Sequence, residues 1–315
     1  MRIILSLSGE NLDLAREEAL AAAETEKYKQ DNNILILETE NKLEKLAFTR
    51  KILKHVFSCK TKNIGDMVKN FDWQKIYKKN FCIRIKGKTS FQEKELASMI
   101  WKKLAKPKVD LENPKTNIQF FFTEKNVHCG LLVYKNIENF MGRRPHLRKG
   151  FHPTSMHPKL ARALVNLSRI KKDQTLLDPF CGTGGILIEA GLLGYKLKGN
   201  DIDERMIELT KKNLEQYKLK AKLTQKDALK IKDKVDAIVT DLPYGKGSYH
   251  NIKLEKLYTN FFEKAHELLK PNKYLVAVFP KKTRPKKGFK IIKEIEYYIH
   301  SSLTRHIIIA KKSGK

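Results

Sequence analysis

The amino-acid sequence predicts an α/β fold, in which a mostly parallel sheet gains an antiparallel C-terminal strand and is preceded by an α+β region. Three observations support this prediction. From Pro158 onward, apolar strands alternate with helical segments of ten or more residues, which is typical of a parallel sheet with helices on both faces. Residues 1–45 and 46–140 form two smaller groups of strand and helix signals. The length of 315 residues suits about two domains.

The first group opens with a strand. The period-2 spacing of Ile3, Leu5 and Leu7 predicts it. Residues 12–26 then carry a strong helical pattern, and residues 32–40 predict a second strand. We assign this group to a small α+β domain.

The second group is predicted to begin with a helix, because residues 42–60 carry helical periodicity. A further helix is predicted over residues 90–106, with Ser90 as its N-cap and Glu93 at the third helical position, which matches a capping box. Strands are predicted at residues 81–87 and, as a pair joined by a Glu-Lys-Asn turn, within residues 118–135.

Residues 141–158 are rich in proline, glycine and basic side chains, so we expect a linker or an ordered functional loop there. The remaining chain, 159–315, is predicted to form one domain. Its helices are predicted at residues 158–170, 184–194, 204–217 and 253–270. Its strands are predicted at residues 175–180, 195–202, 221–227, 235–243 and 274–280, with a terminal hairpin within 290–312.

The charge balance indicates a polyanionic partner. Lys and Arg total 64 against 35 acidic residues, which gives a net charge of +29. Such a field favours nucleic acid. A lysine-rich solvated surface is the alternative explanation, but acidic residues do not balance the lysines. The densest basic stretch is Lys281–Lys290, with six basic residues.

Two classes of protein are disfavoured by composition. No apolar run approaches the roughly 18 residues of a membrane span, and the first residues lack the pattern of a signal peptide. The cysteines are Cys59, Cys82, Cys129 and Cys181. None lies close enough to another for zinc-ligand spacing, so we expect reduced thiols, no metal and a cytoplasmic protein.

The segment LLDPFCGTGGILIEAG contains the first candidate site, because a strand ending at Asp178 runs into a glycine-rich turn and then a helix. Gly182 and Gly184 let a ligand approach the backbone closely. A dinucleotide fingerprint would require a third glycine where Leu187 stands. The carboxylate of Asp178 also argues against a pyrophosphate and favours a ligand with a positive charge.

Two more strands are predicted to end in aspartate. Asp201 follows the next strand, close to where a ribose-binding carboxylate belongs in this topology. Asp227 ends the third strand, where it could face an adenine amino group. Any one of these residues could instead be a helix N-cap, but three caps at three successive strand ends would be a less economical explanation.

Taken in order, DPFCGTGG, GNDID, KDA and DLPYG resemble a class I S-adenosylmethionine-dependent methyltransferase over roughly residues 155–315. The resemblance implies a Rossmann-like domain and S-adenosylmethionine as cofactor. Asp178 and the two glycines would surround the methionine part, Asp201 the ribose and Asp227 the adenine. The cofactor-binding residues predicted in this way are Asp178, Phe180, Gly182, Gly184, Asp201, Ile202, Asp227, Ala228 and Asp241.

The strand at residues 235–241 is predicted to end beside this cofactor, at Asp241-Leu-Pro-Tyr. An exocyclic amine of a base is a poor nucleophile, and Asp241 can accept its hydrogen bond and take its proton. Pro243 fixes the turn, Tyr244 offers a face for a flipped base, and Gly245 lets the chain turn away. The segment resembles the [DN]-P-P-[YF] signature of amino-group methyltransferases, except that Leu242 replaces the first proline.

The front half resembles a ferredoxin-like part over residues 1–45 followed by a THUMP domain over 46–140, as in RNA-modifying enzymes. With the linker, the chain resembles archaeal tRNA (guanine-10-N2) methyltransferases, which implies tRNA as partner and places Thr154 and Ser155 near the cofactor carboxylate. Basic residues predicted to contact RNA phosphate are Arg143, Arg144, Arg148, Lys149, Lys281, Lys282 and Arg284.

Three alternatives remain at this stage. The enzyme could methylate N2 of guanine at another tRNA position, such as 6 or 26, or in ribosomal RNA. It could methylate N6 of adenine, although Asp at 241 and the THUMP-like front half favour guanine. It could also be a non-catalytic RNA-binding protein, which the intact Asp241, Pro243 and Tyr244 disfavour. We expect a monomer, because the sequence shows no zipper and no large apolar stripe.

Overall fold

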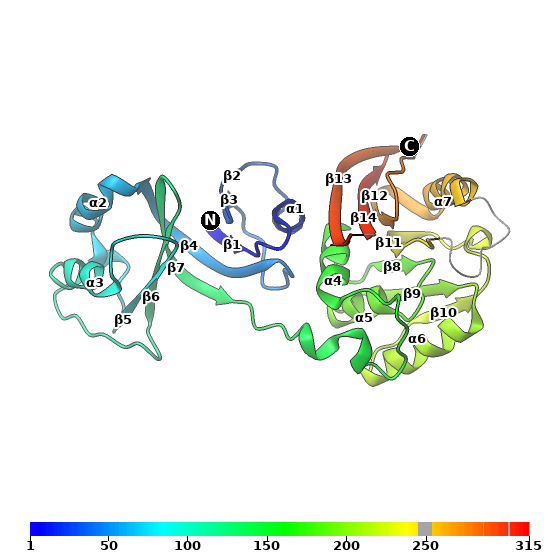
Figure 1. The fold of residues 1–315 in the computed structure, drawn as a ribbon, viewed down its shortest axis with the longest axis horizontal. Helices are drawn as coiled ribbons and strands as arrows, with labels where there is room; N and C mark the ends of the chain where they lie inside the picture. Colours follow the sequence, from blue (N-terminus) through cyan, green and yellow to red (C-terminus); the bar gives the residue numbers. More distant parts are fainter. Residues whose placement is uncertain (245–253, 286, 302, 315) are drawn as a thin grey trace. The chain divides into compact units, whose positions relative to one another are not determined.

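The computed structural model describes residues 1–244, 254–285, 287–301 and 303–314. Gly245 and Lys286, which belong to the predicted strand-end turn and basic stretch, lie outside the described residues. The chain forms two compact units, each built on one seven-stranded sheet (Figure 1). The first unit comprises Met1–Leu12, Ala23–Glu44 and Thr49–Ile137, and the second comprises Asp13–Ala22, Lys45–Phe48 and Glu138–Lys315.

The sheet of the first unit is mixed. Its strand order is β2-β3-β1-β4-β7-β6-β5, and all neighbours are antiparallel except β5 and β6. The strands are β1 (Arg2–Leu7), β2 (Tyr28–Asp31), β3 (Ile34–Glu38), β4 (Thr49–Lys60), β5 (Phe81–Lys86), β6 (Thr116–Phe122) and β7 (Asn126–Lys135). The helical segments between β4 and β6 are η1 (Thr61–Asn63), α2 (Ile64–Asn70), η2 (Trp73–Lys75) and α3 (Glu93–Trp101).

The core of this unit lies under α2 and α3. Trp73 is buried among Phe57, Phe81 and Phe120, and its indole N–H donates to the carbonyl of Val68 at 2.7 Å. Burying this large ring costs no unmet hydrogen bond, which is the condition for a tryptophan in an interior.

The helix predicted over residues 42–60 is wrong, because Thr49–Lys60 forms the strand β4. This strand pairs with β1 on one edge and with β7 on the other. Ile52, Leu53 and Phe57 are buried along it. A central strand gains hydrogen bonds on both edges, so tertiary pairing overrides the local helical periodicity.

The capping box of α3 is shifted from the predicted one. The helix begins at Glu93, with Gln92 as its N-cap, and the Glu95 carboxylate accepts from the Gln92 backbone N–H at 2.9 Å. Glu93 instead accepts from the backbone N–H of Ile85 on β5 at 2.8 Å. The carboxylate expected to cap the helix therefore attaches it to the sheet, and Ser90 lies before the cap.

The second unit has the predicted sheet. Its order is β10-β9-β8-β11-β12-β14-β13. The first five strands in this order pair in parallel, and β14 pairs antiparallel with both β12 and β13. The strands are β8 (Thr175–Asp178), β9 (Lys196–Asp201), β10 (Lys222–Gln225), β11 (Val235–Asp241), β12 (Leu269–Phe279), β13 (Phe289–His300) and β14 (Leu303–Lys312).

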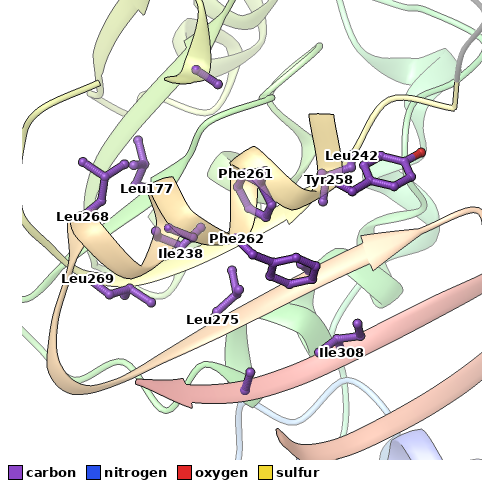
Figure 2. Close-up of a cluster of buried hydrophobic side chains, with 14 of the residues drawn as sticks. Leu177, Ile238, Leu242, Tyr258, Phe261, Phe262, Leu268, Leu269, Leu275 and Ile308 are labelled. Atoms are coloured by element: carbon purple, nitrogen blue, oxygen red, sulfur yellow. The ribbon is translucent and has the colours of Figure 1, made fainter. Parts of the chain in front are cut away.

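Helices cover this sheet. The helical segments within residues 138–315 are η3 (Met141–Arg143), η4 (Pro145–Leu147), α4 (Pro158–Leu167), α5 (Gly185–Leu192), α6 (Glu204–Gln216), η5 (Ala228–Lys230) and α7 (Leu254–Leu268), and α1 (Leu12–Ala23) contributes Asp13–Ala22 to the same unit. The apolar face of α7 packs on β11, β12 and β14 (Figure 2). Phe261 and Phe262 of α7 are buried there, next to Ile238 of β11. This packing fixes the carboxyl end of β11, where the predicted site begins.

Candidate functional site

The predicted site residues gather at the carboxyl edge of the parallel sheet. Asp178, the last residue of β8, pairs in register with Gly199 of β9. On the other side, Leu177 pairs with Ile238 of β11. The hydroxyl of Thr240 on β11 donates to the Asp178 carboxylate at 2.7 Å. The ends of β8, β9 and β11 therefore lie side by side, and the region outside them, the usual ligand position in this topology, is the predicted cofactor crevice.

The glycine turn between β8 and α5 has the predicted backbone freedom. Gly182 and Gly184 have positive φ values of 51° and 78°, which disfavour any residue with a side chain. The Gly182 N–H donates to the Asp201 carboxylate at 2.8 Å. A Cβ added at Gly182 would meet nothing within 4 Å, so open space lies beside this turn, as a bound cofactor requires.

Asp178 is almost fully buried below this turn. Burial raises the pKa of its carboxyl to about 8, with Thr240 and the Phe180 N–H opposing the shift and the nearby Asp201 and Asp241 adding to it. Removal from water disfavours the charged form. A cationic ligand beside Asp178 would favour its charged form, and the α-ammonium and sulfonium groups of the predicted cofactor S-adenosylmethionine are cationic.

The three strand-end aspartates differ in their local bonds. Asp203, not Asp201, is the N-cap of α6, so the Asp201 carboxylate is held by the backbone N–H groups of Gly182 and Asp203. Burial raises the pKa of Asp201, and these N–H groups partly offset the effect. Asp227 accepts from the Leu229 N–H at 2.9 Å and caps the short helix η5. The N-cap interpretation therefore applies to Asp227 alone among the three.

The apolar residues predicted to contact the cofactor lie close to these strand ends. Ile202, directly after β9, is exposed despite its apolar side chain. Ala228 is buried behind Asp227. The ring of Phe180 packs edge-on against that of Phe261, with 5.6 Å between the ring centroids. The exposed Ile202, next to the Asp201 carboxylate, is an apolar surface against which a flat ring can pack.

The predicted linker is an ordered part of the site. The Ser155 hydroxyl lies 2.8 Å from the hydroxyl of Thr183 in the glycine turn. The Asn213 side chain of α6 accepts from the Gly150 N–H and donates to the Gly150 carbonyl. A Cβ on Gly150 would come within 2.6 Å of the Leu209 carbonyl oxygen. The linker is thereby held against the turn, with Ser155 at its edge.

Two residues predicted to contact RNA are committed to the protein interior. Arg143 forms ion pairs with Glu138 and with the fully buried Glu189 of α5, at 3.0 and 2.9 Å. Arg148 is only 4% exposed, and its Nε donates to the Arg143 carbonyl at 3.1 Å. These two predictions are corrected, because a buried or paired guanidinium stabilises the linker and is not free to bind phosphate.

The other predicted RNA contacts differ in their accessibility. Arg144 is half-buried, and Lys149, Lys281, Lys282 and Arg284 are exposed. Lys281 pairs with Glu255, and Arg284 pairs with Glu294. Exposed ion pairs contribute little to stability, so these side chains can exchange their carboxylate partners for the phosphates of a nucleic acid.

The end of β11 holds the predicted catalytic segment and one residue that the sequence did not indicate. The Tyr244 hydroxyl donates to Asp241 Oδ1 at 2.7 Å. Arg305 of β14 lies 3.2 Å from Asp241 Oδ2 through its Nη2, and its Nε donates to the Tyr244 oxygen at 3.0 Å. The Pro243 carbonyl accepts from the buried Tyr258 hydroxyl at 2.9 Å. No local signal identifies Arg305, because it lies in a strand 61 positions beyond Tyr244.

The electrostatics of this cluster balance burial against charge. Burial raises the pKa of Asp241, while the Arg305 charge and the Tyr244 hydroxyl lower it. Burial also raises the pKa of Tyr244 well above its usual range, and the adjacent Asp241 adds to the effect. The result is a carboxylate kept next to a cation in a water-poor site, which suits acceptance of a proton or of an amine hydrogen bond.

A second hollow lies in the first unit. A cavity of about 300 Å³ is lined by Arg50, Lys51 and Lys86 together with Ser6 and Asn33. The described residues that line it include no acidic side chain. Burial lowers the pKa of Lys51, and the charges of Lys86, Lys135 and Arg84 lower it further. Cations crowded around a hollow favour an anionic ligand.

Metal-binding clusters and membrane spans are both absent from the described residues. No group of three or more His, Cys, Asp or Glu side chains there is placed to hold a metal ion. Within the same residues, no helix is both long enough and apolar enough to cross a membrane.

Comparison with known proteins defines the class. A family model described as "RMKL-like, methyltransferase domain" matches residues 145–302, and a model described as "DNA methylase" matches residues 4–212. The crystal structure of TrmN from Thermus thermophilus has the same fold, with a TM-score of 0.51 at 19% identity over 99% of this chain and 100% of its own. The protein is a class I methyltransferase, and S-adenosylmethionine is its methyl donor.

Two relatives narrow the class to a family. The tRNA (guanine(10)-N2)-dimethyltransferase of Methanothermobacter thermautotrophicus is 37% identical over 85% of this chain and 84% of its own length. The protein of the same name from Pyrococcus abyssi is 32% identical over 94% of each chain. The chain belongs to the tRNA (guanine(10)-N2)-dimethyltransferase family.

Proposed function

We propose that this protein methylates the exocyclic N2 of guanine 10 in tRNA, giving N2-methyl- and then N2,N2-dimethylguanosine. The observation that carries the proposal is the Asp241 carboxylate at the end of β11, next to the cofactor crevice at the ends of β8 and β9. The relatives of this chain are named tRNA (guanine(10)-N2)-dimethyltransferases, which supports guanine 10 of tRNA as the substrate. We also infer that the enzyme acts as a monomer in the cytoplasm.

Asp241 has two roles in the proposed reaction. It accepts a hydrogen bond from the amino group, which orients the nitrogen and keeps electron density on it, and it takes the proton that the nitrogen loses. Bound S-adenosylmethionine supplies an electrophilic methyl group whose bonding electrons remain on sulfur. Holding the amine in line with that methyl group provides most of the acceleration, through positioning.

The neighbours of Asp241 prepare the acceptor side. Tyr244 supplies a ring on which a base taken out of its helix can stack. Pro243 lacks a backbone N–H, and its carbonyl is fixed by the Tyr258 hydroxyl, so the turn keeps one shape. A preorganised turn lowers the ordering cost of binding the base.

On the cofactor side, the same chain offers complementary groups. We propose that Asp178, Gly182 and Gly184 surround the methionine part, with Thr154 and Ser155 near its carboxylate. Asp201 and Ile202 would hold the ribose, and Asp227 and Ala228 the adenine. The open space at Gly182 and the buried carboxyl of Asp178 support this placement.

The rest of the tRNA needs a separate grip. We propose that residues 46–140 act as a THUMP-like RNA-binding domain after a ferredoxin-like part at 1–45. The cavity lined by Arg50, Lys51 and Lys86 would be part of the surface that binds the tRNA. Lys149, Lys281 and Lys282 would add phosphate contacts. Binding of this kind weakens steeply with salt, because counterions are released from the backbone.

An atom-level substrate change tests the proposal. Unmodified tRNA transcript is incubated with methyl-labelled S-adenosylmethionine, next to a transcript in which inosine replaces guanosine 10. Inosine lacks only the N2 amino group, so label should enter the first transcript and not the second. Equal labelling of both transcripts would show that the enzyme methylates another position. If neither transcript is labelled, the protein lacks this activity and the non-catalytic RNA-binding alternative is favoured.

A further inference from the structure

Arg305 is the least expected member of the site. It is 8% exposed and reaches the catalytic segment from the C-terminal hairpin. The polar groups of Arg305, Asp241 and Tyr244 pair with one another: Tyr244 donates to Oδ1 of Asp241 and accepts from Arg305 Nε, and Arg305 Nη2 faces Oδ2. These contacts stabilise the trio, because a largely buried polar group is costly when it has no hydrogen-bond partner.

The Tyr244 hydroxyl lies between the Asp241 carboxylate and the Arg305 guanidinium. It uses the donor and acceptor sites of a group that gives a hydrogen to the carboxylate and receives one from the guanidinium. When the tyrosine ring moves to stack on a base, Oδ1 and the Arg305 Nε become available together. Around the space that the hydroxyl leaves, the contacts place acceptor Oδ1 first, then acceptor Oδ2 beside its Arg305 Nη2 partner, and then Arg305 Nε as a donor.

This order is the hydrogen-bonding pattern of cytosine, whose edge presents O2, N3 and the N4 amino group. Guanine is its complement, with the donors N2–H and N1–H followed by the acceptor O6. Adenine offers one donor, N6–H, followed by the acceptor N1. It can satisfy only two of the three groups, and doing so moves its amine from Oδ1 to Oδ2, away from the position that guanine N2 takes.

We propose that Arg305 and Asp241 together read the Watson–Crick edge of guanine, with Arg305 donating to O6, so that Arg305 determines the base specificity of the enzyme. The inference rests on the proposed function, because it requires Asp241 to receive the N2 amino group. Sites built to hydrogen-bond a substrate reject analogues that lack the partner atoms, since buried polar groups are then left unpaired.

The test uses a base that keeps the reacting amino group but lacks the N1–H donor and the O6 acceptor of guanine. 2-Aminopurine has the same amino group, an acceptor at N1 and no O6. Single-turnover methylation is measured on tRNA carrying guanosine or 2-aminopurine at the target position, with wild-type protein and with Arg305→Gln. Wild type should prefer guanosine by at least about a hundredfold, and Arg305→Gln should narrow this ratio by about tenfold or more, the range of a hydrogen bond to a charged group.

A matched control lies in the same strand. Lys312 of β14 is also buried and cationic, and it donates to the carbonyls of His266 and Leu269 instead of to Asp241. Lys312→Gln should leave the guanosine to 2-aminopurine ratio unchanged. If Arg305→Gln lowers both rates equally and keeps the wild-type ratio within about twofold, the specificity role is overturned and Arg305 only positions Asp241.

Two outcomes separate this inference from the proposed function. If wild type methylates neither transcript, the proposed function itself fails. If wild type methylates guanosine and 2-aminopurine equally, the function stands and the edge-reading inference falls. Should Arg305→Gln not fold, Arg305→Lys keeps a cation beside Asp241 but lacks the planar fork. It should still narrow the ratio, and an unchanged ratio would overturn the inference.

Discussion

The cofactor side and the acceptor side of the crevice hold their carboxylates in different ways. At the ends of β8 and β9, Asp178 and Asp201 bond mainly to backbone groups of nearby turns and to one threonine. At the end of β11, Asp241 bonds to the side chains of Tyr244 and Arg305. The first arrangement fixes a site for a ligand common to many enzymes, whereas the second can be rearranged by the base it receives.

The difference predicts that mutations on the two sides affect different constants. Removing the Asp241 carboxylate with Asp241→Ala should reduce single-turnover methylation by about a hundredfold to ten-thousandfold, because the amine loses its acceptor and its base. tRNA affinity, measured by filter binding, should stay within about twofold.

Asp203→Asn is the matched control for this change, since the Asp203 carboxylate caps α6 by accepting from the Arg205 backbone N–H and has no contact with Asp241 among those described. It should retain activity close to wild type. A loss of tRNA affinity in Asp241→Ala as large as its loss of rate would contradict a role in chemistry.

On the cofactor side, Asp201→Ala should weaken S-adenosylmethionine binding by about tenfold to a hundredfold, the effect of losing hydrogen bonds to a charged acceptor. Calorimetric titration of the free protein measures this directly. The rate at saturating cofactor should fall much less, so KM and kcat separate the two sides. A variant with wild-type affinity and a collapsed saturating rate would place Asp201 in the chemistry instead.

The Tyr244 hydroxyl should matter less than its ring. Tyr244→Phe removes the hydrogen bonds to Asp241 and Arg305 but keeps the stacking face, so the rate should change by no more than about tenfold. Tyr244→Ala should lose the additional stacking energy, about 1–3 kcal/mol per base. If the phenylalanine variant is as impaired as the alanine variant, the hydroxyl, and not the ring, receives the base.

The last prediction concerns the dependence of stability on pH. The pKa of Asp178 is about 8 in the folded protein, against about 4 for an unperturbed carboxyl. The folded state therefore holds an extra proton between these values, and stability falls as pH rises through the window. Asp178→Asn has no such titrating group, so the difference between its Tm and that of the wild type should increase in favour of the variant as pH rises from 5 to 8. Above pH 8 this difference should stay constant. Parallel Tm curves would contradict a buried neutral Asp178.

The sequence predicted the features whose partners are near in the chain. The turn containing Gly182 and Gly184 was predictable because positive φ and a strand-to-helix turn leave a local signature. The alternation of strands and helices after Pro158 likewise predicted the parallel sheet. Asp241, Pro243 and Tyr244 were predicted to form the catalytic segment because they lie within four residues of one motif, and that role stays a prediction.

What the sequence could not reveal depends on distant pairing. The segment Thr49–Lys60 has a helical pattern, but β1 and β7 supply edges on both of its sides and make it a strand. Arg143 and Arg148 were predicted to contact phosphate because both are basic residues of the linker. In the structure Arg143 forms an ion pair with Glu189 of α5, and Arg148 donates to the Arg143 carbonyl. Arg305 reaches Asp241 only because β14 inserts next to β12.

The most direct test of N2-guanine methylation is the identity of the product. Wild-type protein is incubated with methyl-labelled S-adenosylmethionine and unmodified tRNA transcript, and the RNA is digested to nucleosides and separated by mass spectrometry. Label in N2-methylguanosine and N2,N2-dimethylguanosine is the predicted result. Label in N6-methyladenosine or in any other nucleoside would contradict the assignment of Asp241 as the acceptor of the guanine amino group.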